Sequence, residues 1–472
     1  MPRNRKKVFS ELKNIEIVDL AAEGKAVARA DNMVVFVTGA IPGDVADLKV
    51  LKKKKNFMEA VPVKFHTYSN LRTKPVCSHF GTCGGCTWQQ MDYTHQLYYK
   101  EKQVKDQFER IGKINTGLIQ PILPSEEVFH YRNKLEFTFS NRRWYTEAPG
   151  ENETVSRNAL GFHIPGRFDR VLDIETCHLQ PEPSNAIRTA IREFAMAHQL
   201  EFHDPYTHEG FLRNLLIRNT VDGQVMVVVT FTLDDKEKRE QLLNDILLKF
   251  PSVHSLMYVI NPKMNDSIAD MEAILYKGEP WLTETMENLK FRVGPKSFFQ
   301  TNTRQGLRLY QVARDFAGLT GNEVVYDLYT GTGTIAMFLA RSARKVIGIE
   351  YIEEAIHDAN VNARLNALGN CEFIAGDMKD VFTDEFIFSK GKPDVIVLDP
   401  PRAGVHEKVI DGILFAQPRK IVYVSCNPAT QARDISRLAE FYEVTRIQPV
   451  DMFPHTQHVE NVALLERRRP TA

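Results

Sequence analysis

The chain of 472 residues and 54.0 kDa exceeds the size at which one hydrophobic core keeps growing, so we expect two or three domains. Its 43% hydrophobic and 25% charged residues are typical of a folded globular protein and exclude wholesale disorder. A formal net charge of zero argues neither for nor against a nucleic-acid partner.

The basic start, residues 1–7, leads into acidic and polar positions rather than into an apolar run, so it does not indicate a signal peptide. The apolar stretches are far too short to span a bilayer. We therefore expect a cytoplasmic protein. The six cysteines of such a chain indicate metal ligation or catalysis rather than disulfide bonds.

Residues 1–65 predict a small five-stranded barrel. Short alternating apolar runs between Ile15 and Phe65 are broken by glycines, as in hairpins. Residues 1–64 carry 13 lysines and arginines against 8 aspartates and glutamates. Charge alone leaves open whether this excess is a solvated face or a patch that faces RNA.

Residues 66–290 predict a mainly antiparallel α+β domain. The segment CSHFGTCGGC supplies three cysteines, and an amphipathic helix follows from about 93 to 111. Strand runs such as KLEFTFS and VMVVVTFTL mix with helical segments near 184–198 and 236–250. We expect this central domain to carry the cysteine loop.

Residues 291–472 predict a doubly wound α/β domain. Runs that are apolar almost throughout, such as EVVYDLY, KVIGIEY and DVIVLDP, alternate with helical segments. This rhythm is typical of a parallel sheet that helices cover on both faces. The expected fold class is therefore α/β, with an N-terminal barrel and a central α+β domain.

The turn DLYTGTGTIA follows the first strand of that sheet. Gly331 and Gly333 allow a tight turn whose backbone can approach a ligand at the helix N-terminus, and Asp327 ends the strand. The same spacing satisfies the dinucleotide fingerprint, with Glu350 placed to bind ribose hydroxyls. A nicotinamide enzyme therefore stays open at this point, as does a turn without any ligand.

Two later strand ends oppose the nicotinamide interpretation. VLDPPRAG places Asp399 at the carboxyl edge of the sheet, where ligands of open α/β sheets bind. IVYVSCNPAT places Cys426 at the end of the neighbouring strand, above the same crevice. A dehydrogenase has no use for such a pair.

The motifs PKSFFQTN, DLYTGTGT, GIEY, LDPPRAG, VSCNPAT and DMFPHTQHVENVALL resemble, in order and spacing, the RNA uracil-C5 methyltransferase family of the TrmA and RumA type. The pattern C-x5-C-x2-C with a distant fourth cysteine resembles the iron-sulfur members of that family. Residues 1–65 resemble their TRAM barrel. The resemblance covers nearly the whole chain and implies S-adenosylmethionine as methyl donor and RNA as partner; we expect a monomer.

The resemblance implies that Cys426 is the nucleophile. Carbon 5 of uracil cannot take a methyl group directly, so a thiolate must first add to carbon 6. Arg402, in the turn beside it, is a candidate for stabilising the thiolate. Glu460 matches the family's base, which removes the proton from carbon 5 after methyl transfer.

The resemblance also implies a binding site for S-adenosylmethionine. Gln300 would hold the methionine end, Tyr329 would pack near the nucleoside, Glu350 would take the ribose hydroxyls and Asp399 would close the site. Asp377 could face the adenine, although an aspartate in such a turn is commonly only a helix cap.

Four thiolates can hold an iron-sulfur cluster or a zinc ion, and their spacing alone does not decide. The family resemblance specifies a [4Fe-4S] cluster held by Cys77, Cys83, Cys86 and Cys177. Members with both the barrel and the cysteines suggest 23S ribosomal RNA as substrate. Transfer RNA is the alternative, and an iron-sulfur dinucleotide-dependent redox enzyme is a distant one.

Overall fold

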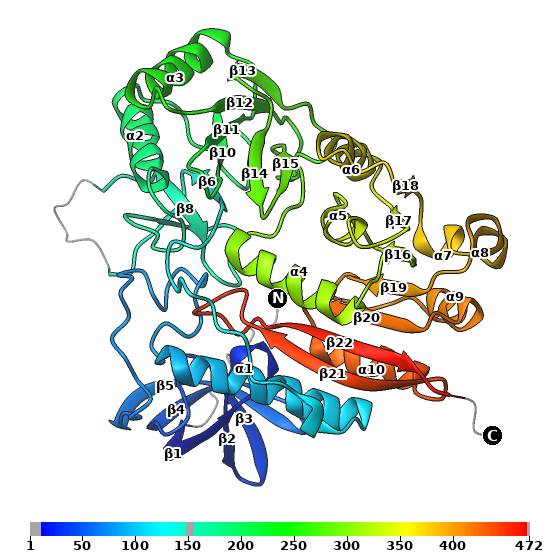
Figure 1. Cartoon of the computed structure of the whole chain (residues 1–472). Coiled ribbons are helices and arrows are strands. Elements are labelled where there is room, and N and C mark those ends of the chain that lie inside the picture. The colour runs from blue at the N-terminus through cyan, green and yellow to red at the C-terminus, as the bar shows by residue number, and fades with distance from the viewer. Residues whose placement is uncertain (1–10, 148–154, 470–472) are drawn as a thin grey trace, which may run out of the picture.

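The computed structural model describes residues 11–147 and 155–469, so the basic start of the chain lies outside the described residues. Figure 1 shows the barrel in blue at the lower left, a central sheet in green at the top, and the C-terminal sheet in yellow to red on the right. Within the described ranges, no helix is long and apolar enough to cross a membrane.

Five strands close the N-terminal barrel in the order β1-β2-β3-β5-β4, which confirms the expected five-stranded barrel. Val35, Val37 and Leu48 are among the buried residues that fill it, because alternate side chains of each strand point inward. The bounds are β1 Glu11–Leu20, β2 Ala26–Ala30, β3 Met33–Val37, β4 Val45–Lys53 and β5 Phe57–Thr67.

The central sheet has eight strands in the order β13-β12-β11-β10-β6-β8-β9-β7 and is antiparallel except for the pairs β11–β12 and β7–β9. Helices α2 (Ser184–Ala197) and α3 (Lys236–Lys249) pack on one face, where Ile191 and Leu242 meet Phe137. The strand bounds are β6 Lys134–Ser140, β7 Arg143–Trp144, β8 Ala159–His163, β9 Val171–Asp173, β10 Leu212–Asn219, β11 Val225–Phe231, β12 Ser255–Ile260 and β13 Ile274–Gly278.

A separate hairpin, β14 (Leu282–Met286) and β15 (Leu289–Val293), connects the central and C-terminal parts. Its residues Met286, Phe291 and Val293 belong to the same apolar cluster as the C-terminal sheet. The division expected at residue 290 therefore falls inside a hairpin that packs with the C-terminal part.

The C-terminal sheet has seven strands in the order β18-β17-β16-β19-β20-β22-β21. The first five are parallel, as expected, but β22 is antiparallel to β20 and to β21. The loop between β21 and β22 contains no crossover helix, and only such a crossover could make them parallel. The bounds are β16 Val324–Leu328, β17 Lys345–Glu350, β18 Cys371–Ala375, β19 Val395–Leu398, β20 Lys420–Ser425, β21 Tyr442–Val450 and β22 Glu460–Arg467.

Helices cover both faces of this sheet. One face packs against α4, α5 and α6 and the other against α7 to α10, so Val325 and its neighbour Tyr326 lie in different apolar clusters. Burial on both sides explains why the strands are apolar throughout. The bounds are α4 Thr303–Ala317, α5 Thr334–Ala340, α6 Glu353–Leu365, α7 Met378–Val381, α8 Asp384–Lys390, α9 Glu407–Ala416 and α10 Pro428–Leu438.

Helix α1 (Tyr93–Gln107) lies between the barrel and the strands β21 and β22 (Figure 1) and ends in a π-helical turn, Phe108–Gly112. The structure confirms a helix where the sequence predicts one. Its buried face is partly polar, however, because Gln96 and Lys100 are fully buried beside Val104.

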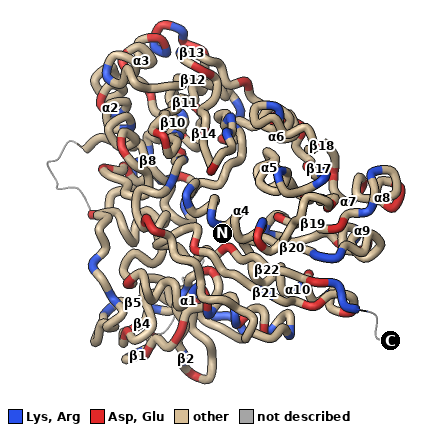
Figure 2. The backbone as a smooth tube through the Cα atoms, viewed as in Figure 1, with Lys and Arg blue, Asp and Glu red and all other residues tan. Residues whose placement is uncertain are grey.

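Charged residues of both signs are interspersed along the backbone of all three parts (Figure 2), as expected for a chain without net charge. Neighbouring charges commonly pair, as Lys102 does with Asp19 of the barrel at 2.9 Å. The net charge of the molecule therefore does not attract a polyanionic partner. Any electrostatic attraction has to come from a local group of cationic side chains.

Candidate active site at the carboxyl edge of the C-terminal sheet

Four parallel strands end at one edge of the C-terminal sheet, where β20 extends two residues beyond the residue that pairs with the end of β19. The register pairs Leu328 of β16 with Ile349 of β17 and with Leu398 of β19. Ligands of open α/β sheets bind at this edge. The residues that end these strands or follow them directly are Tyr329, Glu350, Asp399 and Cys426.

The turn after β16 is built for close approach by a ligand. Gly331 has φ +55°, and a Cβ placed on it would meet no atom within 4 Å, so the space above it is open. Tyr329 also has a positive φ of +68°, which is strained for a residue with a side chain and is typical of functional sites.

Two carboxylates hold this turn in place. Asp327 is fully buried and accepts hydrogen bonds from the Thr330 hydroxyl at 2.6 Å and the Ala336 N–H at 3.0 Å, while its other oxygen has no partner. Burial raises the pKa of Asp327 to about 7. Glu350 accepts from the Gly331 N–H at 3.1 Å, which fixes the distance between the ends of β16 and β17.

Cys426 and Glu460 lie at the end of the ladder between two antiparallel strands. Ser425 of β20 and Asn461 of β22 are its last pair, and Cys426 directly follows Ser425 while Glu460 directly precedes Asn461. The Glu460 carboxyl is close enough to Cys426 to raise the pKa of its thiol, so the two side chains are neighbours. The antiparallel arrangement of β22 thus brings together two residues that the sequence analysis assigns to one reaction.

Burial and nearby acids disfavour the charged forms of both side chains. Burial is the main cause that raises the pKa of the Cys426 thiol to about 11; Glu460 and Asp399 add to it, and Arg402 opposes it. Burial and the Asp399 carboxyl raise the pKa of Glu460 well above its usual range. Burial also raises the pKa of Asp399 to about 7. Arg402 lowers the pKa of the Cys426 thiol, as expected, but this effect is smaller than that of burial.

The turn that carries Arg402 is fastened to α10. The Asn427 amide donates to the Arg402 carbonyl at 3.0 Å. Asp434, fully buried, accepts from the Val405 N–H and from the Tyr423 hydroxyl, both at 2.8 Å. These contacts hold the backbone of the turn next to Cys426, and the Arg402 guanidinium itself lies 3.5 Å from Nδ1 of His458.

Gln300 and Tyr310 complete the crevice. Gln300 is buried in the loop before α4, and the Asn133 amide donates to its carbonyl at 2.9 Å. Tyr310, on α4, is a residue that the sequence analysis misses. Its hydroxyl is hydrogen-bonded to the Gln300 side chain, and its pKa is raised far above the usual value by burial and by the nearby Asp399 and Asp327. Its helical spacing is simply that of a core residue, so no sequence signal marks it.

Asp377 lies at the edge of this group and behaves as a helix cap. Its carboxylate accepts from the Lys379 N–H at 3.2 Å and pairs with the Lys379 ammonium at 2.7 Å. These hydrogen bonds to Lys379 lower its pKa. The geometry thus favours the cap over a contact with a ligand.

The four cysteines of the expected cluster site line one cavity of about 520 Å³ in the central part: Cys77, Cys83, Cys86 and Cys177. Burial, with smaller contributions from the neighbouring cysteines, raises the pKa of the Cys83 thiol to about 11 and of the Cys86 thiol to about 12. In the described part of the chain, no three histidine, cysteine or acidic side chains are arranged to hold a single metal ion. Cys371 lies apart, on β18.

Comparisons with known proteins bear on this crevice. The model of the tRNA (uracil-5-)-methyltransferase family matches residues 279–468, which include every residue from Gln300 to Glu460. A Bacteroides thetaiotaomicron protein named as an uncharacterized RNA methyltransferase is 55% identical over 454 residues, which are 95% of this chain and all of that protein. The chain belongs to the RNA uracil-5-methyltransferase family.

Two further relatives support this family membership. A Porphyromonas gingivalis protein with the same description is 54% identical over 462 residues, 96% of this chain and 99% of that protein. The crystal structure of Pyrococcus abyssi tRNA (uracil-54, C5)-methyltransferase in complex with S-adenosyl-L-homocysteine matches with a TM-score of 0.74 and 26% identity, covering 96% of this chain and all of that one. The methyltransferase therefore takes S-adenosylmethionine as methyl donor, and the alternative of a dinucleotide-dependent redox enzyme is wrong.

The raised pKa of Cys426 predicts how the free methyltransferase reacts with iodoacetamide. Because only the thiolate reacts, alkylation at Cys426 should accelerate about tenfold per pH unit from pH 7 to pH 9, well below the pKa of about 11. Arg402→Gln should slow it at each pH, and Arg437→Gln, an exposed position on α10, should not. Peptide mass spectrometry measures the modification, and a rate already maximal at pH 7 would contradict the assignment.

Proposed function

We propose that this methyltransferase transfers a methyl group to carbon 5 of a uracil in RNA through a covalent bond between Cys426 and carbon 6. The observation that supports the proposal is the pairing of β20 with β22, which ends at Ser425 and Asn461 and leaves Cys426 and Glu460 as neighbours just beyond it. A nucleophile and a base that act on adjacent ring atoms need this closeness, because carbon 6 and carbon 5 are bonded to each other.

The steps balance with these two side chains. When the Cys426 sulfur bonds to carbon 6, the electrons of the C5–C6 double bond move toward carbon 5 and the carbonyl. Carbon 5 then takes the methyl group that S-adenosylmethionine supplies. Glu460 accepts the proton from carbon 5, the C5–C6 double bond forms again, and the sulfur leaves carbon 6 as thiolate.

The raised pKa of Glu460 fits the role of a base, whereas the raised pKa of the Cys426 thiol opposes the role of a nucleophile and has to be overcome. A carboxylate in a dry site is a stronger base than one in water, and Glu460 is only 6% exposed. The Cys426 thiol must lose its proton before it attacks; Asp399, with a pKa of about 7, is a neighbouring carboxyl that is partly ionised at neutral pH. Arg402 then stabilises the thiolate.

The residues around the turn fit the methyl donor. The open space above Gly331 lies between the end of β16 and Glu350, which we propose binds the ribose hydroxyls. Tyr329 would pack near the nucleoside, and Gln300, with Tyr310 beside it, would hold the methionine end. Asp399 would close the site. Asp377 is the weakest member because Lys379 occupies its carboxylate.

Replacing Glu460 with Gln should stop the reaction after methyl transfer. The amide cannot accept the proton, so a covalent protein–RNA adduct should accumulate in the presence of S-adenosylmethionine and appear as a shifted band on a denaturing gel. Cys426→Ala should give neither product nor adduct, yet bind S-adenosylmethionine within about twofold of the unaltered protein. Absence of the band with Glu460→Gln would exclude Glu460 as the base.

We further propose that the four cysteines hold a [4Fe-4S] cluster. The cavity that they line is larger than one ion needs, and the buried thiols resist ionisation unless a cation compensates their charge. Cys77, Cys83 and Cys86 come from one loop and Cys177 from the segment before α2. This is the ligand distribution of the iron-sulfur members that the sequence resembles.

Anaerobically purified protein should be brown and contain about four irons per chain, with broad absorbance at roughly 400 nm. Cys177→Ser should lower the iron content, whereas Cys371→Ser should not, because Cys371 lies outside the cavity. One equivalent of zinc without iron would overturn the cluster.

We propose that the barrel contacts the RNA. Phe65 and Tyr68 stack at a centroid distance of 4.9 Å, and the Arg72 guanidinium lies over both rings. Arg72 is held in this position by the buried Asp44, at 2.7 Å. Tyr68 is 65% exposed, and residues 64–74 contain three cationic side chains and no acidic one. Aromatic rings of this kind stack on unpaired bases.

The substrate that the sequence favours is 23S ribosomal RNA, with transfer RNA as the alternative. The architecture does not separate them, because the Pyrococcus abyssi enzyme that matches over 96% of this chain acts on transfer RNA. Both offer a uracil in a loop, where leaving the stack costs less than in a duplex. We keep 23S ribosomal RNA as the proposed substrate and transfer RNA as the second candidate.

Deleting the gene should remove 5-methyluridine from one position of 23S ribosomal RNA. Nucleoside mass spectrometry, mapped by position in both RNA classes, measures the loss, and a plasmid copy carrying Cys426→Ala should fail to restore it. Loss from transfer RNA alone would refute the proposed substrate and establish the second candidate, while loss from neither would refute the activity.

A further inference from the structure

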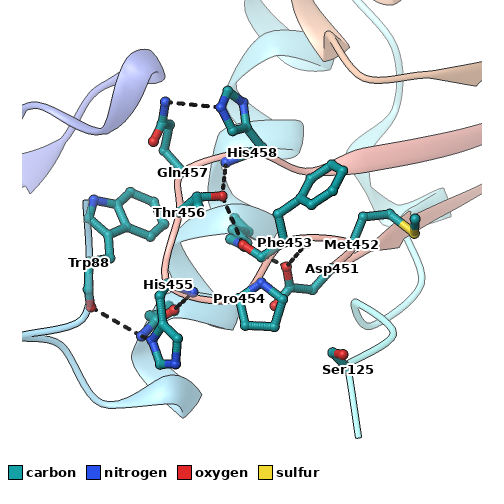
Figure 3. A network of polar contacts seen from close by, with 12 residues as sticks. Trp88, Ser125, Asp451, Met452, Phe453, Pro454, His455, Thr456, Gln457 and His458 are labelled. Carbon is teal, nitrogen blue, oxygen red and sulfur yellow. Dashed lines mark hydrogen bonds and ion pairs between the residues drawn. The ribbon is translucent and has the colours of Figure 1, made fainter. Parts of the chain in front are cut away.

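The loop between β21 and β22, residues 451–459, leads directly into Glu460 and is named the base loop here. Figure 3 shows the polar network around it, with Trp88 on one side and Asp451 on the other. The side chains that α1 contributes are Tyr93, Gln96 and Lys100, spaced three and four residues apart and thus on one face of the helix.

The first contact is an ion pair without exposure to solvent. The Lys100 ammonium lies 2.5 Å from Asp451, and both side chains are fully buried. Lys100 also donates to the Phe453 carbonyl at 3.0 Å, and the Tyr93 hydroxyl donates to Asp451 at 2.8 Å. These bonds fix the start of the base loop against α1.

The second contact consists of the hydrogen bonds of the Gln96 side-chain amide to the middle of the base loop and to Trp88, and is called the clamp here. The His455 N–H donates to the Gln96 side-chain carbonyl at 2.8 Å, and the Gln96 amide donates to the Trp88 carbonyl at 3.1 Å. The His455 carbonyl accepts from the N–H groups of Thr87 and Trp88 at 2.9 and 3.0 Å. His455 has φ +66°, so this backbone shape needs support from its surroundings.

Burying a charge pair and an amide is an expensive way to gain stability. Well-packed apolar side chains would do as well or better, because the charges lose their hydration. Hydrogen bonds, unlike apolar contacts, fix direction. We infer that Gln96, Lys100 and Asp451 are positioning residues that aim Glu460 at carbon 5, an inference that rests on the proposed function of Glu460 as base.

The effect should be largest on one step, because the hydrogen bonds that hold the turn of Arg402 beside Cys426 come from α10 and not from α1. α10 does pack against α1, and the Arg402 guanidinium lies 3.5 Å from His458 of the base loop, but this contact of Arg402 involves neither Gln96, Lys100 nor Asp451. A loosened base loop should therefore leave attack on carbon 6 and methyl transfer intact. Transfer of the carbon 5 proton to Glu460, and with it the release of Cys426, should slow.

Gln96→Leu tests this by removing the clamp while keeping the side-chain volume. Single-turnover reactions with RNA labelled with tritium at carbon 5 measure two rates, methyl transfer and tritium release. We expect methyl transfer within about twofold of the unaltered protein, tritium release slowed at least tenfold, and a covalent adduct on denaturing gels.

Asn362→Leu is the matched control. Asn362 on α6 is buried and clamps the backbone of Arg292 in the same way, accepting from its N–H at 2.8 Å, but it contacts no residue of the base loop. In the control, the ratio of the tritium-release rate to the methyl-transfer rate should equal that of the unaltered protein, whatever the melting temperature. The same ratio in Gln96→Leu and Asn362→Leu would overturn the inference.

The double variant Lys100→Met with Asp451→Asn guards against misfolding, because it removes both charges together and leaves no unpaired one. It should fold and slow tritium release as Gln96→Leu does; tritium release at the unaltered rate would count against the inference. Glu460→Gln serves as reference. If it fails to trap an adduct, the proposed base is wrong; if it traps one and the α1 variants do not, only the positioning role is wrong.

Discussion

The buried pair of Lys100 and Asp451 joins α1 to the loop that precedes β22. The two residues are 351 positions apart, and removing one partner of such a pair typically costs about 3–5 kcal/mol because the other charge stays buried. Through this pair α1 is joined to the loop that leads to Glu460. The same helix contacts the barrel through Lys102 and Asp19, so α1 links the barrel to the C-terminal sheet.

Electrostatics in the crevice follow from the same exclusion of water. Asp327, Asp399, Glu460 and Cys426 would repel one another if all were ionised, and burial raises the pKa of each. Without a ligand, the Cys426 thiol and the Glu460 carboxyl are thus held largely neutral and Asp327 and Asp399 only partly ionised, with Arg402 as the local positive charge. The thiol therefore reacts slowly in the absence of substrate. Binding of a polar substrate ring would add the polar contacts that the site lacks without it.

Much of the fold could be predicted from local patterns. The barrel strands alternate, α2 is strongly amphipathic and the five parallel strands are apolar almost throughout. The strand-end residues Tyr329, Glu350 and Asp399 follow from the rule for open α/β sheets. The direction of β22 could not be predicted, because an apolar strand looks the same in either direction. From the sequence, the closeness of Cys426 and Glu460 therefore rests on family resemblance alone; in the structure, the pairing of Ser425 with Asn461 leaves them as neighbours.

The polar face of α1 could not be predicted either. A buried glutamine and lysine look like solvent-facing residues in a sequence, since both are normally exposed. Their partners, His455 and Asp451, are far away along the chain. Tyr310 was missed for the opposite reason, because an aromatic residue on an apolar helix face is usually only packing.

The pairing of β20 with β22 also limits how the family can vary. In a β-ladder, a slip of one residue turns every side chain to the other face. A single insertion in the base loop that shifted β22 by one residue would turn the Glu460 side chain to the other face of the sheet, away from Cys426. Asn461 resists such a slip, because its amide donates to Gln431 of α10 at 2.7 Å and its carbonyl accepts from the same side chain at 3.2 Å. Insertions and deletions in this enzyme should therefore be tolerated at loop tips far from β22. The number of residues between Asp451 and Glu460 should stay constant.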